Sequence, residues 1–160
     1  MSEFSLNEII ELAVQIEKNG YNFYDNALKR KDLSPRAKEM LTMLRDEELI
    51  HEKTFKNLRD DVDLELLDKS GDWLTVENYL RTIAESHIFL KPDAAINLAV
   101  NSKDEKEIIS NAIAFEKDTL LFFYSLNDTV KNEKSRKIIE KIIKEEISHV
   151  MKLDGILKTM

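Results

Sequence analysis

The sequence predicts an all-α domain built as a four-helix bundle, and three observations carry this prediction. The 160 residues include only 3 glycines and 2 prolines, too few for the frequent turns of a β-sandwich or barrel. Four long segments repeat apolar residues at helical spacing. A stretch rich in acidic residues separates the second of these segments from the third. We therefore expect two antiparallel helical hairpins joined by a long, partly helical crossover.

The expected elements form a single domain over residues 1–160, divided into hairpin 5–60, crossover 61–102 and hairpin 103–158. Three helix starts carry capping signals: a capping box of Ser5 and Glu8, Ser34 followed by Pro35, and a second capping box of Ser102 and Glu105. A capping side chain accepts a hydrogen bond from backbone N–H groups that have no partner within the helix. These signals set the expected starts of the first three bundle helices.

Composition and charge narrow the classes of function. The formal net charge of −7 argues against a nucleic-acid surface, which needs clustered Lys and Arg. The chain has no cysteine, which excludes disulfides, thiolate zinc sites, iron–sulfur clusters and cysteine nucleophiles. No apolar run approaches the ~18 residues of a membrane span, and no signal-peptide pattern is present. We expect a soluble, cytoplasmic protein with no nucleic-acid or membrane partner.

Six polar residues interrupt the apolar stripes and are expected to face the core. They are Glu17, Glu48, His51, Glu116, Glu146 and His149. Burying an unpaired carboxylate is costly unless its pKa shifts until the group is neutral. Four buried carboxylates therefore need a shared compensating charge.

The spacing of these residues places them at one level of the bundle. The midpoint between Glu17 and Glu48 falls in the first predicted turn, so the two lie at equal depth in their hairpin. Glu116 and Glu146 are related in the same way across the second turn. Each Glu-x-x-His places its carboxylate and imidazole on one helix face, one turn apart.

The two halves of the chain also look like copies. The separation from Glu17 to Glu116 is 99 residues, and that from Glu48 to Glu146 is 98. A two-fold arrangement would bring all four carboxylates and both imidazoles together. The charge of four carboxylates balances that of two divalent cations, and oxygen-rich ligation with open positions suits Fe or Mn better than structural Zn. We expect two Fe ions, with Mn or Zn as substitutes; the alternative is a metal-free set of mutually satisfied Glu–His pairs.

On these residues the sequence resembles the ferritin-like superfamily and, within it, the rubrerythrin-like branch, from about Asn7 to Leu157. The resemblance implies a ferritin-like four-helix bundle that forms a homodimer. It also implies ligand roles: Glu17 and Glu116 as terminal ligands, Glu48 and Glu146 as bridges, and His51 and His149 completing the two sites.

Two features depart from rubrerythrins. Those proteins carry a Cys-ligated rubredoxin-type iron domain, and this chain has no cysteine, so its electrons would come from a separate donor protein. Their peroxidase site usually adds a carboxylate one turn after the third-helix Glu, where this chain has Thr119. Iron-storage ferritins resemble the sequence less, because they usually lack the second Glu-x-x-His.

Three further residues are candidates for roles at the site. Tyr24 and Tyr124 lie about two turns beyond Glu17 and Glu116, where a phenol could hydrogen-bond a ligand or relay an electron. The alternative is an ordinary core tyrosine. Gly20, one turn after Glu17, could leave room for a small oxidant or allow close helix packing.

The function expected from these residues is redox chemistry at a buried di-iron site. The protein would reduce peroxide or dioxygen, or oxidise Fe(II), using the six ligands named above. Two alternatives come from other classes: a non-catalytic iron-handling protein, and a structural bundle that binds no metal.

Overall fold

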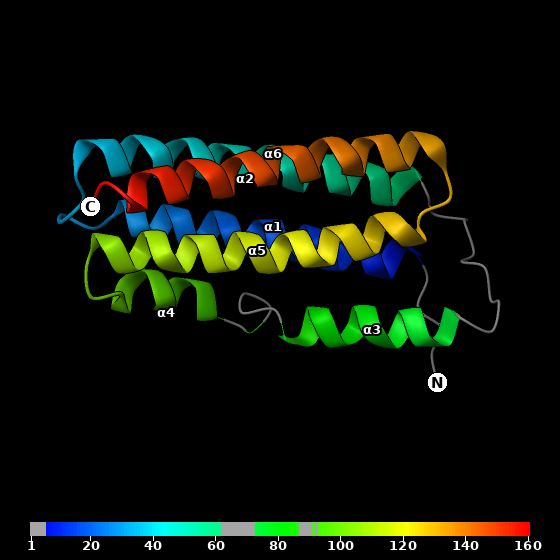
Figure 1. The fold of residues 1–160 in the computed structure, drawn as a ribbon. Coiled ribbons are helices and arrows are strands. Elements are labelled where there is room, and N and C mark those ends of the chain that lie inside the picture. The colour runs from blue at the N-terminus through cyan, green and yellow to red at the C-terminus, as the bar shows by residue number, and fades with distance from the viewer. Residues whose placement is uncertain (1–5, 62–72, 87–90, 92) are drawn as a thin grey trace.

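The computed structural model describes residues 6–61, 73–86, 91 and 93–160, and within these ranges the secondary structure is entirely helical. The described residues form four long and two short helices. Figure 1 shows the long helices side by side, with the short ones along one flank. The long helices are α1 (Leu6–Leu28), α2 (Pro35–Asp61), α5 (Glu105–Thr129) and α6 (Glu133–Leu157), and the short ones are α3 (Trp73–Ser86) and α4 (Ala94–Asn101). The predicted four-helix bundle with a partly helical crossover is confirmed.

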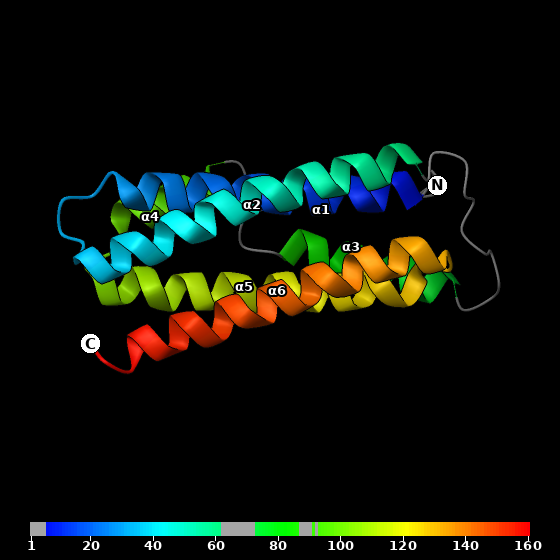
Figure 2. The same ribbon diagram turned by 90° about the horizontal axis from the view of Figure 1, so that it is seen from above.

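Two hairpins make up the bundle. Helix α1 packs along α2, and α5 packs along α6, because a short turn joins the members of each pair. The hairpins meet through contacts of α1 with α5 and of α2 with α6. Both of these pairs run antiparallel, and Figure 2 shows the α1–α2 hairpin lying beside the α5–α6 hairpin. The arrangement encloses one core between four helix faces.

The end of α4 and the start of α5 differ from the predicted capping. Asp104, not Ser102, is the N-cap of α5, and its carboxylate accepts a hydrogen bond from the Glu107 N–H at 2.9 Å. Ser102 instead donates its hydroxyl proton to the Leu98 carbonyl at 2.6 Å, which closes α4. The predicted capping box of Ser102 and Glu105 is therefore wrong, because the Ser102 side chain completes the preceding helix.

The start of α2 agrees with its predicted cap. The Ser34 hydroxyl accepts a hydrogen bond from the Ala37 N–H at 3.2 Å. The backbone N–H of Ser34 donates to the Glu105 carboxylate at 2.6 Å. Glu105 thus links the start of α5 to the start of α2. The other predicted capping box includes Ser5, which lies outside the described residues.

Aromatic side chains fill much of the core between the hairpins. Phe55 of α2 and Phe123 of α5 are fully buried, and their ring centroids lie 5.0 Å apart.

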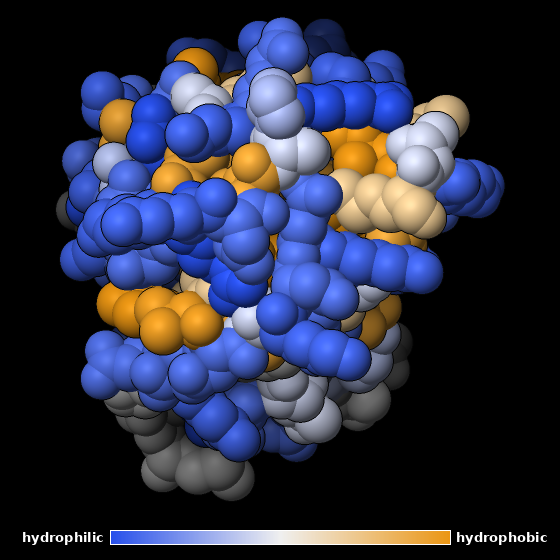
Figure 3. Space-filling view, turned by 90° about the vertical axis from the view of Figure 1, so that its left-hand side faces the viewer, coloured by the Kyte–Doolittle hydropathy of each residue, from blue (hydrophilic) through white to orange (hydrophobic). Residues whose placement is uncertain are grey.

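Arg30 connects the first hairpin to the end of the crossover. Its guanidinium donates hydrogen bonds to the carbonyls of Ala99 at 3.1 Å and Ser102 at 2.6 Å. Figure 3 views the end of the bundle at the α1–α2 turn and shows mostly hydrophilic side chains, with small apolar patches. None of the described helices is long and apolar enough to cross a membrane.

The contact between Phe55 and Phe123 predicts a large effect of truncation. The Phe55→Ala variant should lower the free energy of unfolding by about 3–5 kcal/mol, because it leaves a cavity between the hairpins. Ile50→Ala on the same helix is the control: its side chain is 60% exposed, so a change of about 0.5 kcal/mol is expected. Urea denaturation of the two variants measures both values. Equal losses would contradict this assignment of the core.

Candidate metal centre

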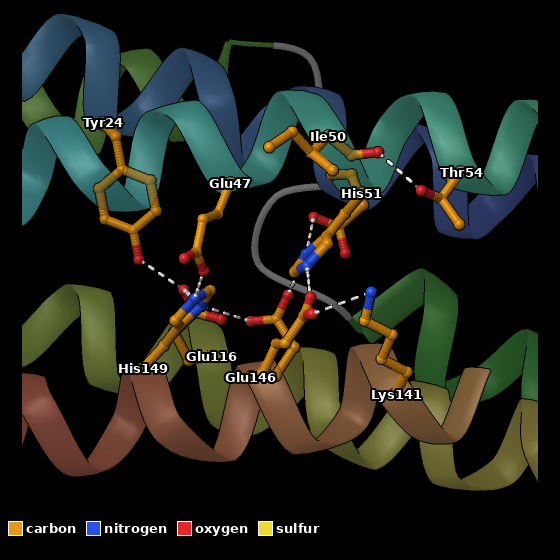
Figure 4. A network of polar contacts seen from close by, with 11 residues as sticks. Tyr24, Glu47, Ile50, His51, Thr54, Glu116, Lys141, Glu146 and His149 are labelled. Atoms are coloured by element: carbon orange, nitrogen blue, oxygen red, sulfur yellow. Dashed lines mark hydrogen bonds and ion pairs between the residues drawn. The ribbon is translucent and has the colours of Figure 1, made fainter. Parts of the chain in front are cut away.

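The structure brings the six predicted ligand residues into one buried cluster. They come from all four bundle helices: Glu17 of α1, Glu48 and His51 of α2, Glu116 of α5, and Glu146 and His149 of α6. Each of these residues is at most 1% exposed. Helical spacing places Glu48 and His51 on the same face of α2. Figure 4 shows His51 facing Glu146 and His149 of α6 across the bundle.

The potential ligand atoms fall into two overlapping groups. Glu48, Glu116, Glu146 and His149 each offer one atom, all within 4.8 Å of one another. Glu17, His51 and Glu146 form the second group by the same measure. Glu146 belongs to both groups, as a carboxylate bridging two cations would.

Glu146 lies between the two imidazoles. Its Oε1 is 2.8 Å from His51 Nδ1, and its Oε2 is 3.1 Å from His149 Nδ1. The outer carboxylates are farther away: Glu17 Oε2 lies 3.6 Å from His51 Nδ1, and Glu116 Oε1 lies 3.7 Å from His149 Nδ1. The imidazole rings are stacked, with centroids 6.0 Å apart and planes at 23°. Both Nδ1 atoms thus point into the carboxylate cluster.

Two carboxylates outside the cluster hold the outer nitrogens of these rings. His51 Nε2 lies 2.6 Å from Glu145 Oε2. His149 Nε2 contacts Glu47 Oε2, as Figure 4 shows. Each contact crosses between hairpins, since Glu47 is on α2 and Glu145 on α6. A carboxylate on one ring nitrogen orients the imidazole and makes the other nitrogen a better ligand.

Glu47 and Glu145 were not among the predicted site residues, although the sequence carries a signal for them. Both Glu-x-x-His motifs are preceded by a second Glu, giving Glu-Glu-Leu-Ile-His and Glu-Glu-Ile-Ser-His. The extra Glu in each motif lies beside the apolar stripe and is partly exposed, so a search for buried polar residues passes over it.

Unpartnered buried oxygens show that the cluster suits cations. Both carboxylate oxygens of Glu17, both of Glu48 and Oε2 of Glu116 accept no hydrogen bond from the described residues. Buried carboxylate oxygens are otherwise almost always paired, because desolvation without a partner is costly. Two divalent cations would partner these oxygens, and the oxygen-rich set with two imidazoles fits iron.

Burial and mutual repulsion shift the pKa values of the carboxyl groups. Burial raises the pKa of Glu17 and Glu48 well above the ordinary value, and repulsion from neighbouring carboxylates adds to it. The same two causes raise the pKa of Glu116 to about 8. Burial also opposes ionisation of Glu146, but hydrogen bonds from Glu116 and both histidines outweigh it and lower the Glu146 pKa.

The histidine pKa values are shifted upwards. Burial disfavours the charged rings, but the hydrogen bond and charge of Glu146 outweigh it and raise the pKa of His51 to about 10. Hydrogen bonds to Glu116 and Glu146 likewise outweigh burial and raise the pKa of His149 to about 11. Without metal, protons on the imidazoles and carboxyls therefore supply the compensating charge, and metal binding must displace them.

The two candidate tyrosines have different surroundings. Tyr24 is fully buried and donates its hydroxyl proton to Glu116 Oε1 at 2.7 Å. Tyr124 is 50% exposed on the outside of α5, so placing it at the site is wrong. Tyr24 follows Glu17 by seven residues, which is close to two full turns, whereas Tyr124 follows Glu116 by eight and is rotated by a further ~100°. Phe123 occupies the position that corresponds to Tyr24.

Gly20 allows close packing at the cluster. A Cβ atom there would lie 2.8 Å from Glu48 Oε2 and 2.7 Å from Phe115 Cζ. The Glu48 carboxylate and the Phe115 ring thus fill the space beside the α1 backbone. Close packing, and not room for an oxidant, accounts for this glycine.

The raised pKa values predict how the stability of the metal-free protein depends on pH. The folded protein holds protons on Glu116, His51 and His149 that the unfolded chain releases more easily, and this stabilisation is lost as pH rises through the folded pKa values. The Tm of chelator-treated protein should therefore fall between about pH 5 and pH 9. In the Glu116→Gln variant this side chain cannot ionise, so its Tm should fall less over this pH range than the Tm of Glu39→Gln, a control at an exposed position. A Tm that rises over this range would contradict the shifts.

Comparisons with known proteins agree with this geometry. The family model for rubrerythrin matches residues 8–157. Among solved structures, the fold is similar to that of a ferritin-like diiron-carboxylate protein from Thermotoga maritima, with a TM-score of 0.70, 22% sequence identity, and coverage of 99% of this chain and 97% of that one. No curated protein matches the chain. Because the family match spans nearly all of the bundle and its buried Glu–His cluster, the chain belongs to the rubrerythrin family.

Proposed function

We propose that this protein is a di-iron carboxylate redox protein that reduces peroxide or dioxygen. One observation carries the proposal: four carboxylates and two imidazoles converge in the core, and carboxylate oxygens of Glu17, Glu48 and Glu116 accept no hydrogen bond from the described residues. In this proposal Glu17 and His51 would hold one iron, and Glu116 and His149 would hold the other. Glu146 belongs to both groups of ligand atoms, and Glu48 belongs to the group of Glu116 and His149. Membership of the rubrerythrin family supports the choice of iron.

Two bound iron ions would together supply two electrons, the number needed to reduce H₂O₂ to water. The protein contributes position, charge and the exclusion of water. Glu145 and Glu47 hold the imidazoles of His51 and His149 with Nδ1 towards the cluster. The Tyr24 hydroxyl holds a proton against Glu116 Oε1.

Burial of the cluster favours a small oxidant as substrate. The six residues are at most 1% exposed, and Phe115 and Phe123 are fully buried in the surrounding core. A larger organic substrate would need an open pocket beside the cluster. Because the chain has no cysteine that could hold an iron–sulfur or rubredoxin-type centre, we propose that the electrons come from a separate donor protein.

Metal content provides the first test. Protein loaded anaerobically with Fe(II) should hold about two iron atoms per chain, as expected for a di-iron bundle. The Glu48→Ala, Glu146→Ala double variant should hold almost none, because it removes two of the four carboxylates that would hold the metals. The matched control is the Glu39→Ala, Glu140→Ala double variant, which changes exposed carboxylates of the same two helices and should retain both atoms. Elemental analysis reports all three values, and an iron-free wild type would support a structural bundle.

Turnover provides the second test. With a chemical reductant in excess, iron-loaded wild type should consume many equivalents of peroxide, and the Glu48→Ala, Glu146→Ala variant should consume peroxide only at the background rate. Oxidation that stops after one equivalent, whatever the supply of reductant, would instead support a non-catalytic iron-handling protein. Peroxide consumption and the oxidation of added Fe(II), each followed over time, distinguish these results.

A further inference from the structure

The internal repeat is broken at two buried positions beside the metal centre. Adding 99 to a residue number in α1 gives the corresponding position in α5, as it does for Glu17 and Glu116. By this rule Tyr24 corresponds to Phe123, and Gly20 corresponds to Thr119. The two halves therefore present different side chains to the cluster.

The first difference leaves the two outer carboxylates unequal. Tyr24 donates a hydrogen bond to Glu116 Oε1 at 2.7 Å. Glu17, the counterpart of Glu116, has both oxygens without a hydrogen bond among the described residues. Phe123 has no hydroxyl to offer and instead packs against Phe55. One outer carboxylate thus has a tyrosine hydroxyl as a hydrogen-bond donor, and the other has no counterpart of it.

The second difference concerns Glu48. Its carboxylate lies against the α1 backbone at Gly20, where a Cβ atom on residue 20 would lie only 2.8 Å from Glu48 Oε2. From there it groups with Glu116, Glu146 and His149, so that four potential ligand atoms lie together. Only three ligand atoms gather around Glu17 and His51. Without a metal, one position is therefore more completely assembled than the other.

We propose that the two metal positions differ in affinity, and that Tyr24 is a positioning residue that makes the Glu116–His149 position fill first. The inference rests on the proposed di-metal function. A held carboxylate has less conformational entropy to lose on binding, so the assembled position binds more tightly. The Glu17–His51 position lacks such a hydroxyl and gathers one ligand atom fewer. Hydrogen bonds to metal ligands typically change metal affinity by about 10–100-fold.

Calorimetric titration of the metal-free protein with Co²⁺ measures this difference without any turnover. Wild type should bind two ions in two steps, whose dissociation constants differ by about 10-fold or more. Removing a ligand assigns the steps. Glu116→Gln should abolish the tight step, and Glu17→Gln should abolish the weak one and leave the tight one.

The Tyr24→Phe variant tests the positioning role. It removes one hydroxyl and should weaken the tight step by about 10-fold, leaving the weak step unchanged. Tyr124→Phe is the matched control, because it removes the same group from the exposed side of α5 and should change neither step. Thermal melting by circular dichroism verifies that both variants fold as the wild type does.

The possible results separate this inference from the function on which it rests. Two Co²⁺ ions bound with equal affinity would overturn the proposed difference between the two positions but would still support the di-metal site. A tight step that survives Glu116→Gln, or equal weakening of both steps by Tyr24→Phe, would overturn the assigned role of Tyr24. Failure of wild type to bind Co²⁺ at all would overturn the di-metal function together with this inference.

Discussion

Compensation of four buried carboxylates is the constraint on which the rest of this structure depends. An ordinary bundle core would hold apolar side chains at these positions, and burying a carboxylate there without a partner is costly. The negative charge of these carboxylates is therefore compensated by protons or by metal cations. The aromatic core, the antiparallel hairpins and the carboxylates around the histidines all serve to hold this charge in one small volume.

The fold and the cluster could be predicted because both follow from periodicity. A helix repeats its faces every 3.6 residues, so a polar residue within an apolar stripe is assigned to the core by sequence alone. Depth in a hairpin follows from distance to the turn, and this paired Glu17 with Glu48 and Glu116 with Glu146. Their convergence on one cluster needed only the additional assumption that the two halves are related by a two-fold axis.

The features that escaped prediction depend on details finer than this period. One residue rotates a side chain by ~100°, which is why Phe123 rather than Tyr124 matches Tyr24. Two capping signals overlap before α5, and only the end of α4 decides that Ser102 belongs to α4. The contacts of Glu47 and Glu145 with the histidines join helices from different hairpins, so no local pattern determines them.

The crossed contacts also bear on when during folding the site becomes competent. The histidine of each hairpin is oriented by a carboxylate of the other, so neither hairpin contains a complete, oriented ligand set. An isolated hairpin could form its helices and its turn, but the imidazole of its histidine would lack the carboxylate that orients it. A metal ion would therefore meet a complete, oriented ligand set only after the two halves have docked. A bound cation would stabilise only those chains in which the two hairpins have already docked.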